Sequence, residues 1–367
     1  MHSKLKYILD IGSSKMSLIA EMQCGKTIRV IAEEEALYDG YMDGEFLSVD
    51  ELDDVLSRLI NGMTQKMRKP ISFITVGVPS EFCICVCKRI SRNFETLHKI
   101  TQSDIKGLYE NNMSFGDSNE YTVVNYSAMQ FVLDDNFKTL TPVGKKTTSL
   151  VMDASYILAK TEFINLIGEK LTQQRVSQID FVSTALGQAN MIERDSNKPV
   201  AIVDVGHIST SVAVLKGEGL ALLSSFSMGG GHISSDIMQV LGMGYKDAEL
   251  IKRKVILTID SQRNEYYEVA SQGSLVKAPI NITNQIVKSR IEMIADVVAD
   301  ILNIDEVFKD IDIYLTGDGV SHFKGVKNIF QDSTGHKINE FKLPFDNSRN
   351  RFQTSKLGLA KLAESAV

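Results

Sequence analysis

Two stretches of the sequence place an aspartate, a glycine and small hydroxyl residues in the same order between two apolar runs. Residues 8–20 read ILDIGSSKMSLIA, and residues 202–214 read IVDVGHISTSVAV. Two apolar runs joined by a short turn of small residues predict a β-hairpin. Such a turn can present backbone N–H groups that bind phosphate oxygens. Asp10 and Asp204, at the strand ends, are placed to hold Mg²⁺ through water, because Mg²⁺ prefers carboxylates and keeps several waters.

A single turn of this kind is more often an ordinary hairpin than a phosphate site, but two copies favour a shared function. Two facing hairpins can hold a polyphosphate between them. The segment YLTGDGVS (314–321) suits the same ligand, because glycines after a buried strand let the backbone approach a flat ligand closely. In DAELIK (247–252), Glu249 and Lys252 share one helix face and can contact a ribose and a base.

Length and composition predict a two-lobed protein. The 367 residues exceed one ordinary core, and 43% hydrophobic with 23% charged residues is typical of a globular chain. The net charge of −6 argues against nucleic-acid binding. No apolar run is long enough to span a membrane and no secretory signal is recognised, so we expect a cytoplasmic protein. Cys24 and the alternating Cys83, Cys85 and Cys87 of one predicted strand are expected to be reduced.

Strands and helices alternate around these motifs. Strands are expected at YILDIG, MSLIAEMQ and TIRVIAEEEAL, followed by an amphipathic helix over 50–67 capped by Ser48 or Asp50. Residues 80–159 are interpreted as a small α+β module whose helix begins at Thr101. The second half predicts a helix after the glycines at 229–231, a polar hairpin or loop over 261–283, and helices over 283–302, 320–330 and 355–367.

The ordered motifs resemble the actin, Hsp70 and sugar-kinase superfamily, with its phosphate-1, phosphate-2 and adenosine loops. Within it the sequence is similar to the FtsA family of bacterial actin homologues, with PilM as a near relative. The likeness rests on YILDIGSSKMSL, SMGGGHISSDI, DAELIK and LTGDGVSHFKGV. In the 80–159 module, ITQSDIKGLYE, YTVVNYSAMQFVLDD and TPVGKK look like the FtsA subdomain 1C. The resemblance covers nearly the whole chain and implies an α/β, two-lobed actin-like ATPase fold of duplicated RNase H-like domains.

The resemblance also implies subdomain boundaries and nucleotide-binding residues. The expected subdomains are 1–79 and 161–197 (1A), 80–160 (1C), 198–228 and 303–353 (2A), 229–302 (2B) and 354–367 (the closing helix of 1A). The residues expected to bind ATP or ADP are Asp10, Gly12, Ser13, Ser14, Lys15, Asp204, Gly206, Ser209, Thr210, Gly229, Gly230, Glu249, Lys252, Gly317 and Gly319. Asp10 and Asp204 are the expected Mg²⁺ ligands, and no catalytic residue is assigned.

The second turn departs from the family pattern Asp-Ile-Gly-Gly-Gly-Thr-Thr-Asp. His207 and Ile208 replace two glycines, and Ser211 replaces the closing aspartate. A side chain at a position that needs a positive φ costs about 1–2 kcal/mol, so we expect this turn to adopt another conformation or to lie further from the phosphate. His207 is interpreted as a solvated loop residue, with a phosphate contact as the alternative.

These departures predict weak or absent hydrolysis. The interlobe position that carries an acid in Hsp70 holds Phe181 here. Groups that orient the attacking water typically lower the free energy of the transition state by several kcal/mol. Gln174, Gln178 and Gln188 are candidates for positioning water by residue type alone.

The FtsA resemblance implies an ATP-binding adaptor that polymerises and links the division machinery to the membrane. It implies binding of the FtsZ C-terminal tail by subdomain 2B, contacts with other division proteins, and a place at the inner face of the cell membrane at the division site. FtsA-type proteins end in an amphipathic membrane helix, whereas the last residues here have too few apolar and basic side chains for one. We therefore expect membrane contact through a segment outside this sequence or through a partner.

Two other functions are compatible with the motifs. A PilM-like scaffold would bind the cytoplasmic tail of a pilus or secretion membrane protein. The altered second turn and the missing membrane helix favour it, whereas GGGHISSDI and DAELIK favour FtsA. A sugar or carboxylate kinase would need a catalytic base and a substrate domain, and the 80–159 module shows no acid in a recognisable motif for that role.

Overall fold

The computed structural model describes residues 5–24, 27–38, 40–115, 119–195, 198–259, 265–341 and 354–365. The strands are β1 (Leu5–Ile11), β2 (Lys15–Cys24), β3 (Thr27–Leu37), β4 (Tyr41–Met42), β5 (Glu45–Phe46), β6 (Phe73–Val78), β7 (Cys83–Lys99), β8 (Tyr121–Val132), β9 (Lys138–Thr139), β10 (Lys146–Lys160), β11 (Gln178–Ser183), β12 (Val200–Val205), β13 (Thr210–Lys216), β14 (Gly219–Phe226), β15 (Tyr266–Ser271), β16 (Ser274–Pro279), β17 (Asp312–Thr316) and β18 (Ile338–Glu340). The helices are α1 (Val49–Met67), α2 (Gln102–Glu110), α3 (Thr161–Gln173), α4 (Thr184–Ala189), α5 (Gly230–Leu241), α6 (Tyr245–Lys252), α7 (Ile280–Leu302), α8 (Val326–Thr334) and α9 (Thr354–Ser365), with short 3₁₀ turns η1 (Ser80–Phe82), η2 (Asp134–Asn136) and η3 (Glu306–Phe308).

The first lobe is built on a five-stranded sheet in the order β11-β6-β1-β2-β3. β1 pairs antiparallel with β2 and parallel with β6, so the first predicted hairpin is confirmed. Both faces of β1 are covered, as its continuous apolar run requires: Leu9 packs with α1 and α3, and Ile8 packs with α9. The Ser48 hydroxyl caps α1 by accepting a hydrogen bond from the Glu51 N–H.

The second lobe repeats this topology. Its sheet has the order β14-β13-β12-β17-β18, with β12 antiparallel to β13 and parallel to β17. Numbered within each lobe, both sheets have the order 3-2-1-4-5, with the first three strands antiparallel and the last two parallel to the first. The two similar sequence motifs therefore follow equivalent strands, β1 and β12, and their recurrence reflects the internal symmetry of the fold.

The segment between β6 and α3 forms a third sheet, in the order β7-β10-β8-β9, with α2 packed against it. α2 begins with a capping box between Thr101 and Asp104. The Thr101 hydroxyl accepts a hydrogen bond from the Asp104 N–H, and the Asp104 carboxylate accepts one from the Thr101 N–H. This segment is the α+β module that the sequence predicts. Cys85 and Cys87 lie on the side of β7 that faces β14, where their thiols donate to the Leu220 carbonyl oxygen at 3.2 and 3.6 Å. Both are free thiols, as expected.

The helix predicted over 320–330 is wrong in its first half. Residues 320–325 form turns and a β-bridge between Lys324 and Ile256, and α8 begins only at Val326. Gly325 has a φ of 97°, a left-handed conformation that a continuous right-handed helix does not contain. The hairpin predicted as one alternative over 261–283 is confirmed by β15–β16, which the start of α7 follows, while residues 261–264 lie outside the described part.

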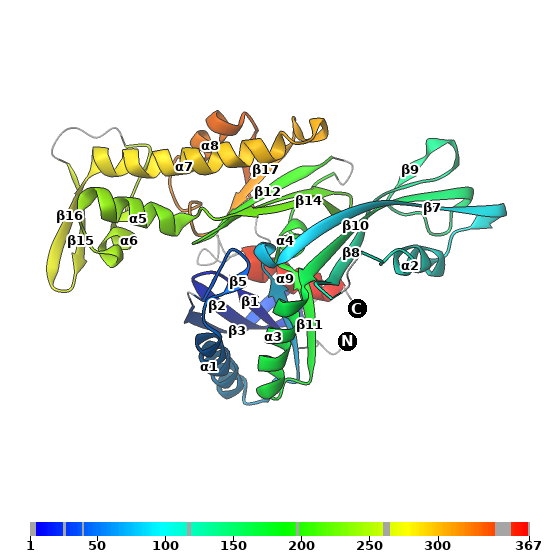
Figure 1. Cartoon of the computed structure of the whole chain (residues 1–367), viewed down its shortest axis with the longest axis horizontal. Coiled ribbons are helices and arrows are strands. Elements are labelled where there is room, and N and C mark those ends of the chain that lie inside the picture. Colours follow the sequence, from blue (N-terminus) through cyan, green and yellow to red (C-terminus); the bar gives the residue numbers. More distant parts are fainter. Residues whose placement is uncertain are drawn as a thin grey trace.

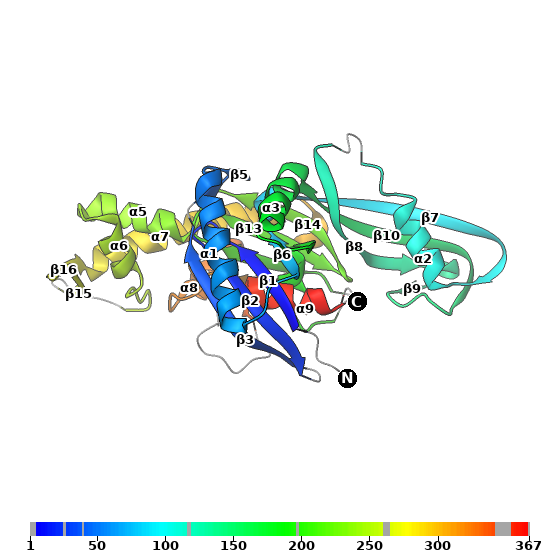
Figure 2. The same ribbon diagram turned by 90° about the horizontal axis from the view of Figure 1, so that it is seen from below.

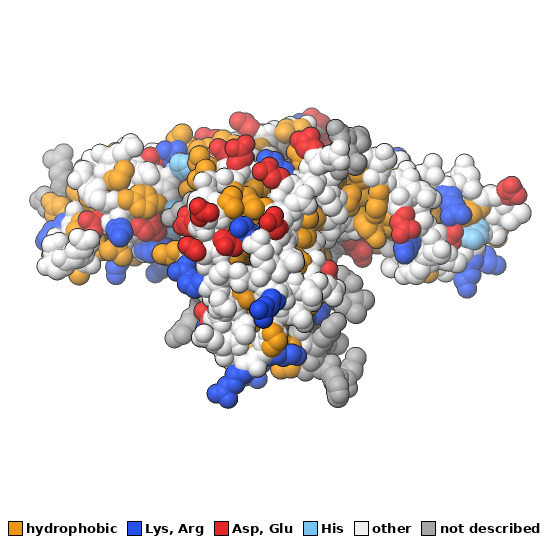
Figure 3. Space-filling model, turned by 60° about the horizontal axis from the view of Figure 1, so that its bottom comes forward, with side chains coloured by type: hydrophobic (Ala, Val, Ile, Leu, Met, Phe, Trp, Pro, Cys, Tyr) orange, Lys and Arg blue, Asp and Glu red, His pale blue; other side chains and the backbone are white. Residues whose placement is uncertain are grey.

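The molecule has a T-shaped outline, in which the first lobe is the stem (Figure 1). One arm holds α5, α6, β15 and β16, and the other holds the β7–β10 sheet; the views from below and in space-filling form keep both arms apart (Figures 2 and 3). α4 and α9 cross at the centre, where Gly187 and Gly358 let their backbones touch, since a Cβ on either would lie closer than 3.0 Å to the other's backbone. Among the described helices, none is both long enough and apolar enough to cross a membrane.

Candidate functional site

The two hairpin turns close in the same way. In residues 12–15, the first glycine loop, the Gly12 N–H donates to the Lys15 carbonyl oxygen at 3.0 Å. In residues 206–209, the second glycine loop, the Gly206 N–H donates to the Ser209 carbonyl oxygen at 2.8 Å. A Cβ on Gly12 would lie 2.9 Å from the Lys15 oxygen, which is closer than real Cβ atoms come. The closure therefore requires a residue without a side chain at that position.

His207 and Ile208 do not strain the second glycine loop. Neither has a positive φ, although five other non-glycine residues in the described part of the chain do. The four-residue closure needs no left-handed residue where these side chains stand, so they carry no backbone strain; that the loop differs from the family's glycine loop, or lies further from the phosphate, stays a prediction. The second glycine loop shares the closing hydrogen bond of the first.

The His207 ring is packed against the second lobe and is not a freely solvated loop residue. Its Nε2 lies 3.1 Å from the Tyr245 hydroxyl at the start of α6. A Cβ on Gly231, in the first turn of α5, would lie 2.8 Å from the same Nε2. The second glycine loop has thus gained an imidazole, and the facing helix provides a glycine that leaves room for it.

This packing predicts that Gly231→Ala lowers the free energy of unfolding by about 1 kcal/mol, since the new methyl group pushes the tip of the His207 ring away from the Tyr245 hydroxyl. The double variant His207→Ala/Gly231→Ala should recover part of that loss. Denaturant unfolding of the two single variants and the double variant measures the coupling. Strictly additive effects would contradict the proposed fit between the ring and the glycine.

Residues 317–321, the third glycine loop, pack directly on the second. The Gly319 N–H donates to the Val205 carbonyl oxygen at 2.8 Å, and the Gly230 N–H donates to the Gly206 carbonyl oxygen at 2.9 Å. A Cβ on Gly317 would lie closer than 3.0 Å to the Asp204 Oδ1, and one on Gly319 would lie as close to the Gly206 oxygen. The structure therefore gathers the predicted glycines of the second lobe into one cluster: Gly206, Gly229, Gly230, Gly317 and Gly319.

Asp10 and Asp204 end their strands beside this cluster. Asp10 accepts a hydrogen bond from the Ser355 hydroxyl of α9. The Asp204 Oδ2 accepts from the Gln188 Nε2 of α4 at 2.5 Å. Burial raises the pKa of both carboxyl groups, and the pKa of Asp204 reaches about 6, with the nearby Asp10 charge adding to the rise. The Asp204 carboxylate is therefore kept charged at neutral pH at some cost in stability.

The two carboxylates fit a hydrated Mg²⁺ better than a cage of protein ligands. Within the described ranges, no group of three His, Cys, Asp or Glu side chains is arranged to hold a metal ion. Mg²⁺ usually retains several waters and takes one or two carboxylates together with phosphate oxygens. Asp10 and Asp204 can supply the carboxylates, and a bound cation would neutralise charge on them and on a phosphate chain.

Contacts between the lobes join the first and second glycine loops. The Ile208 N–H donates to the Ser13 Oγ at 3.3 Å. The Ser209 hydroxyl donates to the carboxylate of Glu81, in η1 just beyond β6. The two loops thus face each other across the junction of the lobes, which is the arrangement a phosphate clamp needs.

Glu249 and Lys252 lie at the edge of the glycine cluster, beside the start of α5. The Lys252 ammonium is almost fully buried and donates to the Gly230 carbonyl oxygen at 2.9 Å and to the Glu249 Oε2 at 2.6 Å. Burial lowers the pKa of Lys252, and the Glu249 charge opposes that change. The pair forms one fixed polar unit within reach of the glycine backbone.

Three other residues that were predicted to bind the nucleotide form hydrogen bonds or ion pairs within their own lobe. Lys15 forms an ion pair with Glu35 of β3 at 3.2 Å. The Thr210 hydroxyl is buried and donates to the Met228 carbonyl oxygen at 2.6 Å. The carbonyl oxygen of Ser14 accepts from the Tyr38 N–H at 3.1 Å. A phosphate would compete with the first two of these contacts.

Sequence reasoning missed Glu81. It sought an interlobe acid at position 181, but Phe181 packs in the first-lobe core beside the Phe163 ring. Glu81 follows the carboxyl end of β6, a strand parallel to β1, and sheets of this kind bind ligands at that end of their strands. This position in the sequence could have identified Glu81 as a candidate. Of the candidate glutamines, Gln188 reaches the site through Asp204, whereas Gln174 donates to Ser57 on α1.

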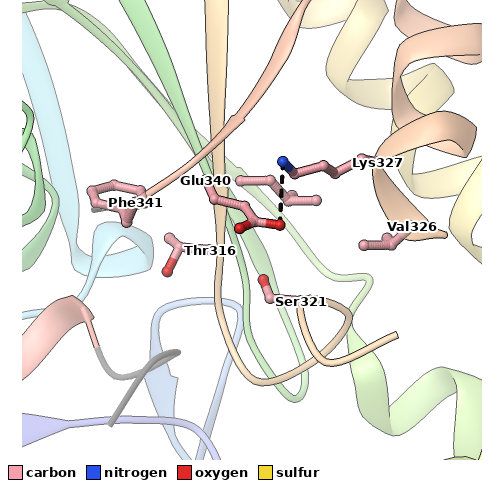
Figure 4. Close-up of a pocket in the computed structure, with 7 residues that line it drawn as sticks. Thr316, Ser321, Val326, Lys327, Glu340 and Phe341 are labelled. Atoms are coloured by element: carbon pink, nitrogen blue, oxygen red, sulfur yellow. Dashed lines mark ion pairs between the residues drawn. The ribbon is translucent and has the colours of Figure 1, made fainter. Parts of the chain in front are cut away.

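A small cavity of about 40 Å³ lies beside the third glycine loop, between β17, β18 and α8. Figure 4 shows the Lys327–Glu340 ion pair, 3.2 Å long, next to the side chains of Thr316 and Ser321. The cavity has room for about one or two water molecules. Its lining includes none of the residues predicted to bind the nucleotide, so it is separate from the glycine cluster.

Known proteins resemble the chain in sequence and in fold. The family model of the cell division protein FtsA matches residues 201–358. The cell division protein FtsA of Bacillus subtilis is 22% identical over 317 residues, which span 82% of this chain and 70% of that protein. The fold matches a chain of a PilM–PilN type IV pilus biogenesis complex with a TM-score of 0.62, 14% identity, and 97% and 96% of the two chains covered. It matches ADP-bound MreB5 of Spiroplasma citri with a TM-score of 0.59, 12% identity, and 99% and 97% covered.

These matches agree with the duplicated sheets and with the motifs at their strand ends. The solved structures show the two-lobed actin-like ATPase fold, and the sequence matches give the likeness to FtsA. The chain therefore has the actin-like ATPase fold and resembles the cell division protein FtsA in sequence.

Proposed function

We propose that the chain binds ATP or ADP with Mg²⁺ between its two lobes and acts as an adaptor in cell division. The observation that supports this most is the meeting of the glycine cluster with Asp10 and Asp204 at the lobe junction. The backbone there is bare enough for a flat or phosphorylated ligand to approach, and the two carboxylates suit a hydrated cation. The ADP-bound MreB5 structure has the same fold, which adds support for a nucleotide.

Nucleotide binding predicts that ADP or ATP with Mg²⁺ raises the melting temperature and binds one to one in calorimetry. Asp10→Asn should weaken this binding by about tenfold or more, because it removes a charge expected to hold the cation. Asp312→Asn is a matched control, since Asp312 begins β17 at the end remote from Thr316 and the third glycine loop. A wild-type chain with no response to either nucleotide would contradict the proposed function.

Hydrolysis is proposed to be weak or absent. His207 and Ile208 fill positions of the second glycine loop, and Ser211 provides no carboxylate to orient water. Phosphate release from ATP should therefore stay far below about 1 s⁻¹, the low end of ordinary enzyme turnover. A turnover near that value, lost in Asp10→Asn, would contradict this part of the proposal.

We further propose that the protein self-assembles into filaments and links FtsZ and other division proteins to the inner face of the membrane. The likeness to FtsA supports this, and the arm that holds α5, α6, β15 and β16 projects from the centre, where a partner's tail could reach it (Figure 1). The subdomain boundaries given above remain part of the proposal. Electron microscopy with ATP on a lipid surface and binding of a labelled FtsZ C-terminal peptide test the two claims separately.

A PilM-like scaffold is the second candidate. The fold matches a PilM–PilN complex chain over nearly the full length of both chains, and the second glycine loop carries side chains in place of glycines. Under this alternative the chain would bind the cytoplasmic tail of a pilus or secretion membrane protein. A pull-down that compares such a tail with the FtsZ tail distinguishes the two candidates.

A further inference from the structure

Glu81 is a half-buried carboxylate at the lobe junction that the glycine motifs do not account for. It lies in η1, directly after Pro79. Its neighbour Phe82 is fixed in an aromatic cluster, 4.6 Å from the Phe163 ring and 5.3 Å from the Tyr41 ring between centroids. The Glu81 carbonyl oxygen also touches Gly44, where a Cβ would lie closer than 3.0 Å. The backbone that carries this carboxylate is therefore anchored in the core of the first lobe.

The carboxylate of Glu81 competes with a phosphate for the second glycine loop. The Ser209 hydroxyl has a single hydrogen, and it is donated to Glu81. The Ile208 N–H is donated to Ser13. A phosphate that reaches the same donors has to displace these partners. If the phosphate takes the Ile208 N–H, it displaces the neutral Ser13 hydroxyl. If it takes the Ser209 hydroxyl, it displaces the Glu81 carboxylate, and two anions then face each other.

Among the residues that the structure describes, no lysine or arginine forms an ion pair with the Glu81 carboxylate. Burial raises its pKa, and the charge of Asp43 in the β4–β5 turn raises it further. Asp43 itself accepts a hydrogen bond from the Ser227 hydroxyl of the second lobe. The lysines near the loops are matched with other acids: Lys15 with Glu35, Lys252 with Glu249, and Lys356 with Glu33.

We propose that Glu81 makes the site favour a nucleoside diphosphate over a triphosphate. This rests on the proposed binding of a nucleotide between the lobes. A terminal phosphate that extends to Ser209 meets a carboxylate held in a poorly hydrated junction, where like charges repel much more strongly than in water. A diphosphate is shorter by one phosphate and avoids that contact. Glu81 is thus a specificity-determining residue that holds the Ser209 hydroxyl until a ligand takes it.

The test compares Mg²⁺-ADP with a Mg²⁺-bound non-hydrolysable ATP analogue by calorimetry. The wild-type chain should bind ADP more tightly. In Glu81→Gln the side-chain carbonyl can still accept from Ser209 while the charge is gone, so the affinity ratio should shift toward the ATP analogue by about tenfold or more. Asp43→Asn is the matched control: it also removes a carboxylate that accepts from a serine of the second lobe, but at an exposed position, and should shift the ratio less than about threefold.

An unchanged ratio in Glu81→Gln overturns this inference and leaves nucleotide binding standing. A wild-type chain that binds the ATP analogue more tightly than ADP also overturns this inference. Because that comparison needs only the wild-type chain, it tests the preference for ADP even if Glu81→Gln does not fold. A wild-type chain that binds neither nucleotide contradicts the proposed function and this inference together. Melting of the nucleotide-free variants shows whether either substitution has disturbed the fold.

Discussion

Gly317→Ala is expected to lower the free energy of unfolding by about 3–5 kcal/mol and to abolish nucleotide binding. Gly317 has a φ of 94°, a conformation that costs an alanine about 1–2 kcal/mol. The added Cβ would also overlap the Asp204 Oδ1 and the Val205 carbonyl oxygen. Both neighbours belong to the strand end that presents the second glycine loop, so relief of the overlap must move the candidate site itself.

Gly335→Ala provides the matched control. Gly335 also has a positive φ, 71°, and caps the end of α8, but a Cβ there would meet nothing within 4 Å. This variant should lose about 1–2 kcal/mol from backbone strain alone and keep its nucleotide binding. Denaturant unfolding and calorimetry with Mg²⁺-ADP measure both properties. Equal losses of stability in the two variants would show that close packing at Gly317 contributes nothing beyond the strain.

Local patterns predicted much of the fold and of the site. The hairpins at 8–20 and 202–214, the cap of α1 and the capped start of α2 follow from apolar periodicity and turn chemistry within short segments. The duplicated motif also predicted two lobes, because a repeated strand-turn-strand unit at equivalent positions requires two similar sheets. The glycines of the second and third loops meet, and Ser13 of the first loop contacts the second loop.

Contacts between distant segments were not predictable from local patterns. Glu81 meets Ser209 only because the first lobe places the end of β6 against the second lobe, and neither residue stands in a motif that names the other. The fit of His207 to Gly231 depends on the same kind of long-range packing. The start of α8 was misplaced because the apolar residues of 320–330 have helical spacing, whereas the left-handed Gly325 decides where the helix begins.

Asp204→Asn is expected to stabilise the nucleotide-free protein at neutral pH and to weaken its binding of Mg²⁺-nucleotide. Burial raises the pKa of Asp204 to about 6, above its ordinary value of 3.8. Between these values the folded chain binds a proton more readily than the unfolded chain, so the free energy of unfolding contributed by this group falls as the pH rises. The penalty is absent below about pH 4 and complete above about pH 6. A shift of this size corresponds to about 1–3 kcal/mol.

Asparagine removes that penalty and can still accept a hydrogen bond from Gln188 through its side-chain oxygen. The gain in melting temperature over the wild type should therefore be clear at pH 7.5 and should vanish near pH 4. Addition of Mg²⁺-ADP should stabilise the wild type strongly and Asp204→Asn weakly, because the variant lacks a carboxylate for the cation. Asp312→Asn, on the neighbouring strand β17, is expected to change neither comparison. A variant that is no more stable at pH 7.5, yet responds fully to Mg²⁺-ADP, would mean that the buried charge of Asp204 is not kept for a bound cation.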